Sequence, residues 1–134
     1  MACGRGTPKL IQGGSTLHSG GGDYTSQGPL ISAIAYLQTG NCGLNGENCL
    51  IVETTLKNPT PGQPGSGSST DLSLIPPHAY NDVPIKFGYR NGCGGAGKGC
   101  GRPGCDDAFH TPNETNKQVA CQTNNVDLHI IFCP

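Results

Sequence analysis

The residues of this chain with the most suggestive chemistry are suited to holding a sugar. A sugar site needs an aromatic side chain against the apolar C–H face of the ring, and donors and acceptors matched to neighbouring hydroxyl or acetamide groups. Residues 78–82 place an imidazole, a phenol, an amide and a carboxylate in one short loop, and the strand expected to follow ends in a tyrosine and an arginine. The first candidate glycan site therefore comprises His78, Tyr80, Asn81, Asp82, Tyr89 and Arg90.

This first candidate site also has a purely structural interpretation. An Asn-Asp pair before a strand, here at 81–82, is ordinary turn chemistry. Tyr89 shares a period-2 face with apolar residues, which is typical of a core position; that face consists of Val83, Ile85, Phe87 and Tyr89. A second candidate glycan site is therefore kept beside the first: His18 with Asp23 and Tyr24, in the Gly/Ser-rich and turn-forming segment 11–28.

The remaining reactive residue types form no recognisable catalytic or metal-binding pattern. The four histidines are scattered, without an i, i+4 pair or the carboxylate spacing of a calcium loop. No serine lies in a nucleophile-elbow motif. The glycine-rich run 92–104 departs from a phosphate-binding loop because Gly and Cys follow Lys98. We expect no metal, no cofactor and no enzymatic activity.

Cysteine content indicates the compartment. The eight cysteines are an even number, and no pair has the CxxC spacing of a zinc ribbon or redox motif. Such a set predicts four disulfides, which persist in oxidising compartments, so the protein is expected to be secreted and extracellular. A sequon for N-glycosylation at Asn113 agrees with secretion.

Length and charge restrict the domain organisation and the partners. The 134 residues fit a single domain, 1–134. The net charge is −1 and no Lys/Arg cluster occurs, which argues against nucleic acid and anionic membrane surfaces as partners. No apolar run approaches the length of a membrane span, so membrane insertion is not expected.

Hydrophobic periodicity predicts about five strands and one or two helices. The helix is expected over 29–40, where Pro29 suits the first position, the apolar residues fall on one face and Gly40 follows the end. A short helical turn is also expected near 106–109. Strands are expected at 49–57, 69–75, 83–89, 117–122 and 126–132, with Asn124-Asn125 as a hairpin turn between the last two. Pro84 suggests an edge position for the strand at 83–89.

Two groups of known proteins resemble parts of this sequence. Cys-Asp-Asp-Ala-Phe at 105–109, Val-Ala-Cys at 119–121 and the closing strand 126–134, which ends Phe-Cys-Pro, resemble the end of thaumatin-like proteins. Nearly the whole chain is similar to a family of small secreted mushroom proteins called glycopeptides, which includes a lectin for LacdiNAc-type glycans. The motifs that carry this second resemblance are Cys-Gly-x-Gly-Thr-Pro and Leu-Ile-Gln-Gly-Gly within 3–14, Asp-Tyr-Thr-Ser at 23–26, and the segment 28–43.

The resemblance implies an architecture and a function. The fold expected is α+β, an antiparallel sheet flanked by helical segments in an α-β-α sandwich; the alternative is a reduced thaumatin-like β-sandwich. The function expected is that of a fungal lectin that binds N-acetylhexosamine-containing glycans of glycoproteins or cell surfaces without catalysis. A homodimer is expected to form when an uncovered edge strand pairs with its twin.

The thaumatin-like resemblance also implies a disulfide pairing, which spacing alone leaves open among many connectivities. The implied pairs are Cys3–Cys133, Cys42–Cys49, Cys93–Cys121 and Cys100–Cys105. By the same resemblance, Glu53 and Asp71 match two acidic positions of a cleft that some thaumatin-like proteins use against β-glucan. Pro76-Pro77 stands where that family has a further acidic residue, so half of the cleft is absent. A β-glucan-binding or β-glucanase defence protein is therefore the second functional hypothesis, and a defence protein directed at another protein is the third.

Overall fold

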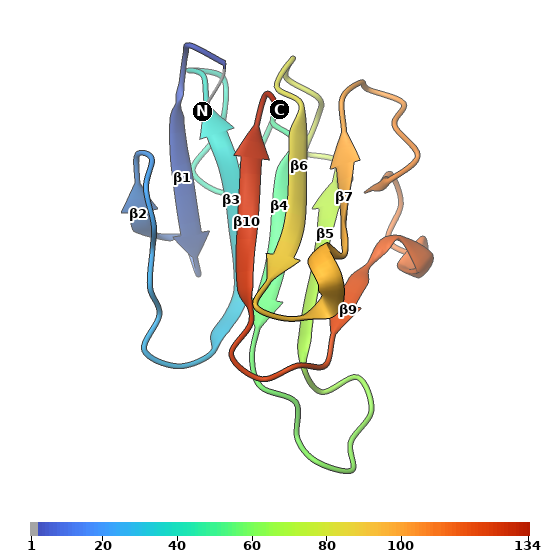
Figure 1. Ribbon diagram of the computed structural model, residues 1–134. Coiled ribbons are helices and arrows are strands. Elements are labelled where there is room, and N and C mark those ends of the chain that lie inside the picture. Colours follow the sequence, from blue (N-terminus) through green and yellow to red (C-terminus); the bar gives the residue numbers. More distant parts are fainter. Residues whose placement is uncertain (1–2) are drawn as a thin grey trace.

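Two β-sheets face each other in the computed structural model, which describes residues 3–134 (Figure 1). Sheet A has seven strands in the order β2-β1-β3-β4-β5-β8, and β9 also pairs with β5. These strands are β1 (Thr7–Gln12), β2 (Ser15–Ser19), β3 (Leu30–Gln38), β4 (Ile51–Leu56), β5 (Ser68–Ser73), β8 (Ala108–Phe109) and β9 (Val119–Cys121). Sheet B has three strands in the order β10-β6-β7. They are β6 (Ile85–Arg90), β7 (Gly97–Cys100) and β10 (Asp127–Phe132).

The expected α+β fold with helical flanks is wrong, because the described residues contain only two short 3-10 helices, η1 (Cys93–Gly95) and η2 (Thr115–Lys117). The residues expected to form a helix at 29–40 form β3, which pairs antiparallel with β1 on one side and β4 on the other. The turn expected to be helical near 106–109 leads instead into β8. Of the two architectures considered from the sequence, a two-sheet sandwich is the one that the strands resemble.

A β-bulge explains why β3 has a helix-like sequence pattern. The register with β4 shifts between Leu30 and Ala33, and Ser32 has a positive φ of 52°. An inserted residue changes which face the following side chains occupy, so strict alternation is lost. Beyond the bulge both faces are covered, since Ala35 and Tyr36 point to opposite sides and are both buried.

Strand alternation was a sound guide elsewhere, but it did not show which strands pair. Strands β4, β5, β6, β9 and β10 lie within or close to the expected ranges. The expected hairpin at Asn124-Asn125 is wrong, because β9 pairs with β5 in sheet A while β10 pairs with β6 in sheet B. The expected edge position of β6 is also wrong, since β6 lies between β10 and β7 and Pro84 precedes the strand.

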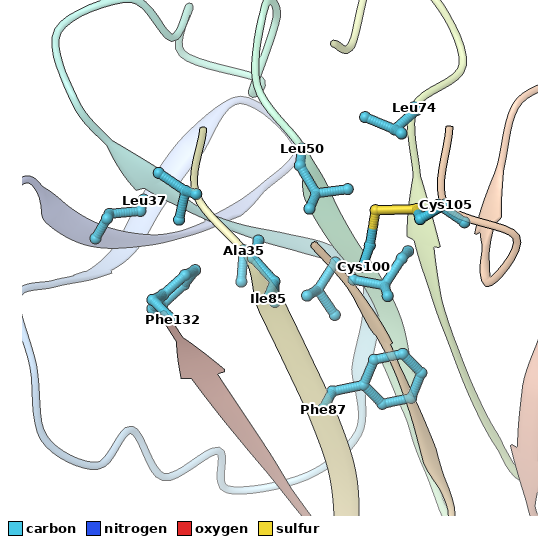
Figure 2. Close-up of a cluster of buried hydrophobic side chains, with 13 residues drawn as sticks. Ala35, Leu37, Leu50, Leu74, Ile85, Phe87, Cys100, Cys105 and Phe132 are labelled. Carbon is cyan, nitrogen blue, oxygen red and sulfur yellow. A yellow bond between two sulfur atoms is a disulfide. The ribbon is translucent and has the colours of Figure 1, made fainter. Parts of the chain in front are cut away.

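The main core lies between the two sheets (Figure 2). Its buried residues come from both sheets and from the loops that join them: Ala35, Leu37, Leu50, Val52, Leu72, Leu74, Val83, Ile85, Phe87, Cys100, Cys105, Ala108 and Phe132. A smaller cluster of Ile11, Tyr36 and Ile51 is also buried, and Ile51 lies on the face of β4 opposite to the core residue Val52. Sheet A is therefore partly covered on both faces.

Four disulfides join all eight cysteines. The pairs are Cys3–Cys133, Cys42–Cys49, Cys93–Cys121 and Cys100–Cys105, the same as those implied by the thaumatin-like resemblance. The first spans a sequence separation of 130 residues and ties the two ends of the chain together. Cys100 at the end of β7 is joined to the loop that follows it, Cys93 of η1 is joined to Cys121 of β9, and Cys42–Cys49 closes the segment between β3 and β4.

Replacing Gly97 with alanine is expected to destabilise the protein by at least about 1–3 kcal/mol, the usual cost of overpacking. Gly97 pairs with Gly88 in the ladder of β6 and β7, and a Cβ atom at this position would overlap the carbonyl oxygen of Phe87. Urea denaturation measures the change. Gly104→Ala is the matched control, because a Cβ atom there would meet nothing within 4 Å; equal stability of the two variants would contradict the packing argument.

Candidate functional site

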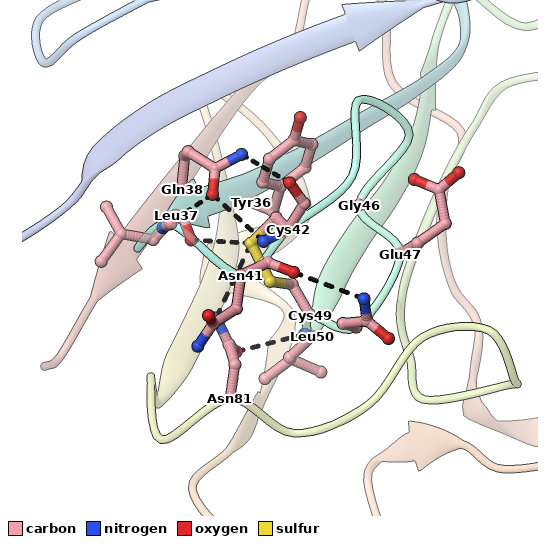
Figure 3. Close-up of a disulfide and its surroundings, with 12 residues drawn as sticks. Tyr36, Leu37, Gln38, Asn41, Cys42, Gly46, Glu47, Cys49, Leu50 and Asn81 are labelled. Carbon is pink, nitrogen blue, oxygen red and sulfur yellow. Dashed lines mark hydrogen bonds between the residues drawn. A yellow bond between two sulfur atoms is a disulfide. The ribbon is translucent and has the colours of Figure 1, made fainter.

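The loop at 78–82, the first candidate glycan site, fastens a neighbouring disulfide loop (Figure 3). His78 Nδ1 donates to the carbonyl oxygen of Gly46 at 2.8 Å, and Asn81 Oδ1 accepts from the backbone N–H of Leu50 at 3.3 Å. The Cys42–Cys49 bond closes the segment that contains Gly46. His78 and Asn81 thus hold the 42–49 loop in place. The atoms that form these two hydrogen bonds are not free to bind a ligand.

The other residues of the first candidate site separate into core and surface positions. Tyr80 is half-buried and packs against the main core, and the backbone carbonyl of Asp82 accepts from Arg5 Nη2 at 3.1 Å. Tyr89 is 1% exposed; its hydroxyl donates to the carbonyl of Val119 at 2.7 Å and lies 2.8 Å from Thr70 Oγ1. Burial disfavours the charged phenolate and therefore raises the pKa of Tyr89. Arg90 is exposed and lines the larger of the two cavities described below.

A long groove opens where sheet B fails to cover sheet A. Sheet B has three strands against seven in sheet A, so β1 and β2 extend beyond β10 (Figure 1). The groove, about 1410 Å³ in volume, runs between β10 and strands β1 and β3, and the segment joining β2 to β3 borders it. We call it the inter-sheet groove. Its apolar lining includes Leu10, Leu30, Ile31, Leu56, Leu128 and Ile130.

The inter-sheet groove brings together the second candidate glycan site and one end of the first. His18, Asp23 and Tyr24 line it from the β2–β3 side, and Arg90 lines it from sheet B. The Tyr24 side chain is 40% exposed, and its ring centroid lies 6.0 Å from that of His18. The aromatic ring that a sugar would need is therefore accessible in this groove.

Two polar residues of β10 that line the inter-sheet groove, Asp127 and His129, were not predicted from the sequence. Arg90 Nη2 donates to His129 Nδ1 at 2.6 Å, and the Asn91 amide donates to the Asp127 carboxylate. Asp127 and His129 alternate along β10 with Leu128 and Ile130, so they form its polar face at the rim of the groove. Their alternation was visible in the sequence, but their proximity to Arg90 depends on the β6–β10 register, which pairs Asp127 with Arg90.

The charged side chains that line the inter-sheet groove form no ion pair within the described residues. Lys9, Lys57 and Arg90 line it together with Asp23 and Asp127. Within residues 3–134 the ion pairs are Lys98–Asp107 and Lys117–Glu114, and neither lies in this groove. Positively and negatively charged side chains therefore lie beside the apolar residues of the groove.

The two acidic residues that resemble a thaumatin-like cleft lie on the outer face of sheet A. Glu53 and Asp71 are paired across β4 and β5 and line a smaller cavity of about 260 Å³, which we call the outer cavity. Burial raises the pKa of Asp71 to about 8, and a hydrogen bond with Glu53 and the charge of Glu53 add to the effect. A carboxylate pair that hydrolyses a glycosidic bond must lie on either side of that bond, whereas Glu53 and Asp71 are direct neighbours in one ladder.

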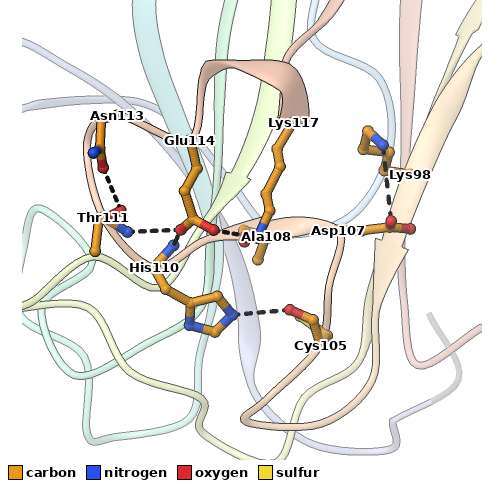
Figure 4. Close-up of polar contacts among 9 residues, drawn as sticks. All are labelled: Lys98, Cys105, Asp107, Ala108, His110, Thr111, Asn113, Glu114 and Lys117. Carbon is orange, nitrogen blue, oxygen red and sulfur yellow. Dashed lines mark hydrogen bonds and ion pairs between the residues drawn. The ribbon is translucent and has the colours of Figure 1, made fainter.

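The glycosylation sequon lies in an ordered turn (Figure 4). The Asn113 side chain is exposed, and its Oδ1 accepts from Thr111 Oγ1 at 2.6 Å. Glu114 accepts from the backbone N–H groups of His110 and Thr111 and forms an ion pair of 2.7 Å with Lys117. Lys117 and then these backbone donors lower the pKa of Glu114 to about 2. The turn therefore presents Asn113 at the surface.

In the part of the chain that the structure describes, no helix has the length and apolar character that crossing a bilayer demands. No known protein family, curated protein or solved structure matches this chain. The geometry of the inter-sheet groove and the outer cavity is thus the basis for the functional argument.

Proposed function

We propose that this protein is a secreted, non-catalytic lectin that binds N-acetylhexosamine-containing glycans of the LacdiNAc type in the inter-sheet groove. The observation that carries the proposal is the groove itself, in which the exposed ring of Tyr24 lies with Asp23 and Arg90 above an aliphatic floor. This combination provides an apolar surface for a ring face together with polar groups for hydroxyls. The resemblance to the mushroom glycopeptide family supports the sugar class.

Each side of the inter-sheet groove would have a distinct role in binding. Tyr24 would stack on the C–H face of one sugar, while the Arg90 guanidinium donates to hydroxyl or acetamide oxygens. Asp127 and Asn91, which hydrogen-bond to each other, would bind hydroxyls at the rim through their remaining donors and acceptors. The volume of about 1410 Å³ exceeds what one monosaccharide fills, which favours an oligosaccharide.

Secretion and dimerisation belong to the same proposal. The four disulfides suit an oxidising, extracellular environment. Strand β2 is the end strand of sheet A and pairs only with β1 among the described strands. Pairing of β2 with its twin across a two-fold axis would give a homodimer with a continuous sheet, and two grooves would add avidity on a cell surface.

A glycan array is the direct test, and Tyr24→Ala is expected to lower the affinity for the best glycan about fivefold, since loss of an aromatic contact costs roughly 1 kcal/mol. Tyr24→Phe keeps the ring face and is expected to keep most of the affinity. Leu44→Ala is the matched control, because Leu44 is 53% exposed and lies outside the groove. An array without any N-acetylhexosamine ligand would refute the proposal.

An assay of β-1,3-glucan hydrolysis distinguishes the β-glucanase hypothesis from the lectin proposal. Hydrolysis of β-1,3-glucan would release reducing sugar, and a carboxyl group with a pKa near 8 has the protonation state of a general acid at neutral pH. We rank this hypothesis second because the two carboxyl groups of the outer cavity lie against each other. Reducing-sugar release that is lost in Glu53→Gln would reverse this ranking.

A further inference from the structure

No basic residue lines the outer cavity, and apart from Ala33 and Ile34 its lining consists of oxygen-bearing side chains. These are Ser32, Glu53, Thr55, Ser69, Asp71 and Gln118. They come from the bulge of β3, from β4 and β5, and from the segment just before β9. Six side chains of the lining, two of them carboxylates, carry an oxygen atom that could coordinate a cation.

The strand register places the two carboxylates side by side. Glu53 pairs with Asp71 across the antiparallel ladder of β4 and β5, and Thr55 pairs with Ser69 in the same ladder. Directly opposite residues have Cβ atoms about 4.5–5.5 Å apart. All four side chains therefore project from one small area of the outer face of sheet A.

Asp71 is buried, and one of its two carboxyl oxygens has no partner in the described structure. Its side chain lines the outer cavity although the residue is only 7% exposed, and its Oδ2 atom has no hydrogen-bond partner in the described structure. Neither Glu53 nor Asp71 takes part in the ion pairs found within residues 3–134. A buried carboxyl oxygen without a donor or a cation is costly, and a bound cation would remove this cost.

We infer that the outer cavity is a binding site for a divalent cation of the calcium type, held by the carboxylates of Glu53 and Asp71. Side-chain oxygens of Ser69 and Gln118, together with water, would complete the coordination. The cation supplies the positive charge that the orphan Oδ2 atom of Asp71 lacks. It would also connect β4, β5 and the segment before β9.

The donor set selects the class of cation. Every candidate ligand is an oxygen, which suits hard cations and not zinc. Nowhere in residues 3–134 do three or more His, Cys, Asp or Glu side chains gather as a ligand group, so neutral oxygens must share the coordination. Calcium accepts irregular sets of carboxylate and neutral oxygens, whereas magnesium demands near-octahedral geometry. Two carboxylates suit a weak site, with a dissociation constant on the order of 0.1–1 mM as in extracellular modules.

The sequence predicted no metal because no motif places metal ligands close together along the chain. Here the two carboxylates are separated along the sequence and meet only through the pairing of β4 with β5. The inter-sheet groove is lined by a different set of residues, without Glu53 or Asp71. Cation binding is thus distinct from the proposed glycan binding.

The test uses the full chain, freed of metal with EDTA and dialysed, in thermal unfolding and calorimetric titration with CaCl2. With 10 mM CaCl2 the melting temperature is expected to rise by roughly 5 °C, and MgCl2 at the same concentration is expected to have a smaller effect. Glu53→Gln and Asp71→Asn should each abolish the rise and the binding heat. Asp106→Asn, which changes an exposed carboxylate outside the cavity, should retain both.

Three results would overturn the inference. The first is no shift in melting temperature and no binding heat in the unsubstituted protein up to 10 mM CaCl2. The second is a calcium-dependent rise that persists in both cavity variants. The third is a rise produced by methylammonium but not by calcium, which would assign the cavity to a protonated amine. Because Glu53 is only half-buried, its glutamine variant tests the site even if the Asp71 variant fails to fold.

Discussion

Replacing Asp71 with asparagine is expected to stabilise the cation-free protein at pH 8 by on the order of 5 kcal/mol. The pKa of Asp71 is raised from 3.8 to about 8 in the folded state, chiefly by burial and then by Glu53. Between these two values the folded state holds a proton that the unfolded state releases. Stability therefore falls as the pH rises from about 4 to about 8, and the neutral amide of the variant removes this fall.

Urea denaturation in EDTA at a series of pH values measures the effect. The unsubstituted protein is expected to lose stability across the window, while Asp71→Asn changes much less and gains its largest advantage at the alkaline end. Asp106→Asn is the control for a general change in net charge, because Asp106 is exposed. A flat profile in the unsubstituted protein would show that Asp71 does not hold a proton in the folded state.

Removing the Cys3–Cys133 bond by a double substitution to serine is expected to cost about 5 kcal/mol. The bond closes a loop with a sequence separation of 130 residues, so its loss frees the unfolded chain more than the loss of any other bond. Stabilities of small domains are about 5–15 kcal/mol, so this variant is expected to be partly unfolded near 37 °C. Circular dichroism during heating gives the comparison.

The Cys42–Cys49 bond is the control for that experiment. It has a sequence separation of 7 residues, and the same chain-entropy argument gives it only about half the effect. Equal losses of stability in the two double variants would contradict the dependence on loop length. The Cys3 and Cys133 side chains are only partly buried, so lost packing is a smaller contribution for that pair than for the buried Cys49.

Periodicity predicted strands only where the sequence alternates over an unbroken ladder. Strand β10 is the clearest case, since Leu128, Ile130 and Phe132 face inward while Asp127 and His129 do not. Strand β3 was misread because the bulge at Ser32 interrupts the alternation. Strand β7 was hidden because its glycines signal turns, although one of them, Gly97, is required by the close approach of the Phe87 carbonyl.

The sequence predicted individual residues of the candidate sites, but not which of these residues lie together in the folded protein. The chemical character of Tyr24, Asp23 and Arg90 was evident from the sequence, yet their meeting in one groove depends on the unequal widths of the two sheets. His78 and Asn81 have the same residue types as a sugar site, but hydrogen bonds to the 42–49 loop occupy them. Residue type limits what a side chain can bind, and tertiary contacts decide whether it is available.

The bond between the chain ends also determines how the protein responds to a pulling force. Cys3 and Cys133 are joined directly, and in Figure 1 both ends of the ribbon lie at the same end of the molecule. Tension applied before Cys3 and after Cys133 would pass through one covalent bond and bypass every strand between them. A molecule tethered in this way would keep its hydrogen-bonded ladders unloaded until that bond is reduced, so its mechanical resistance is set by redox chemistry rather than by the sheets.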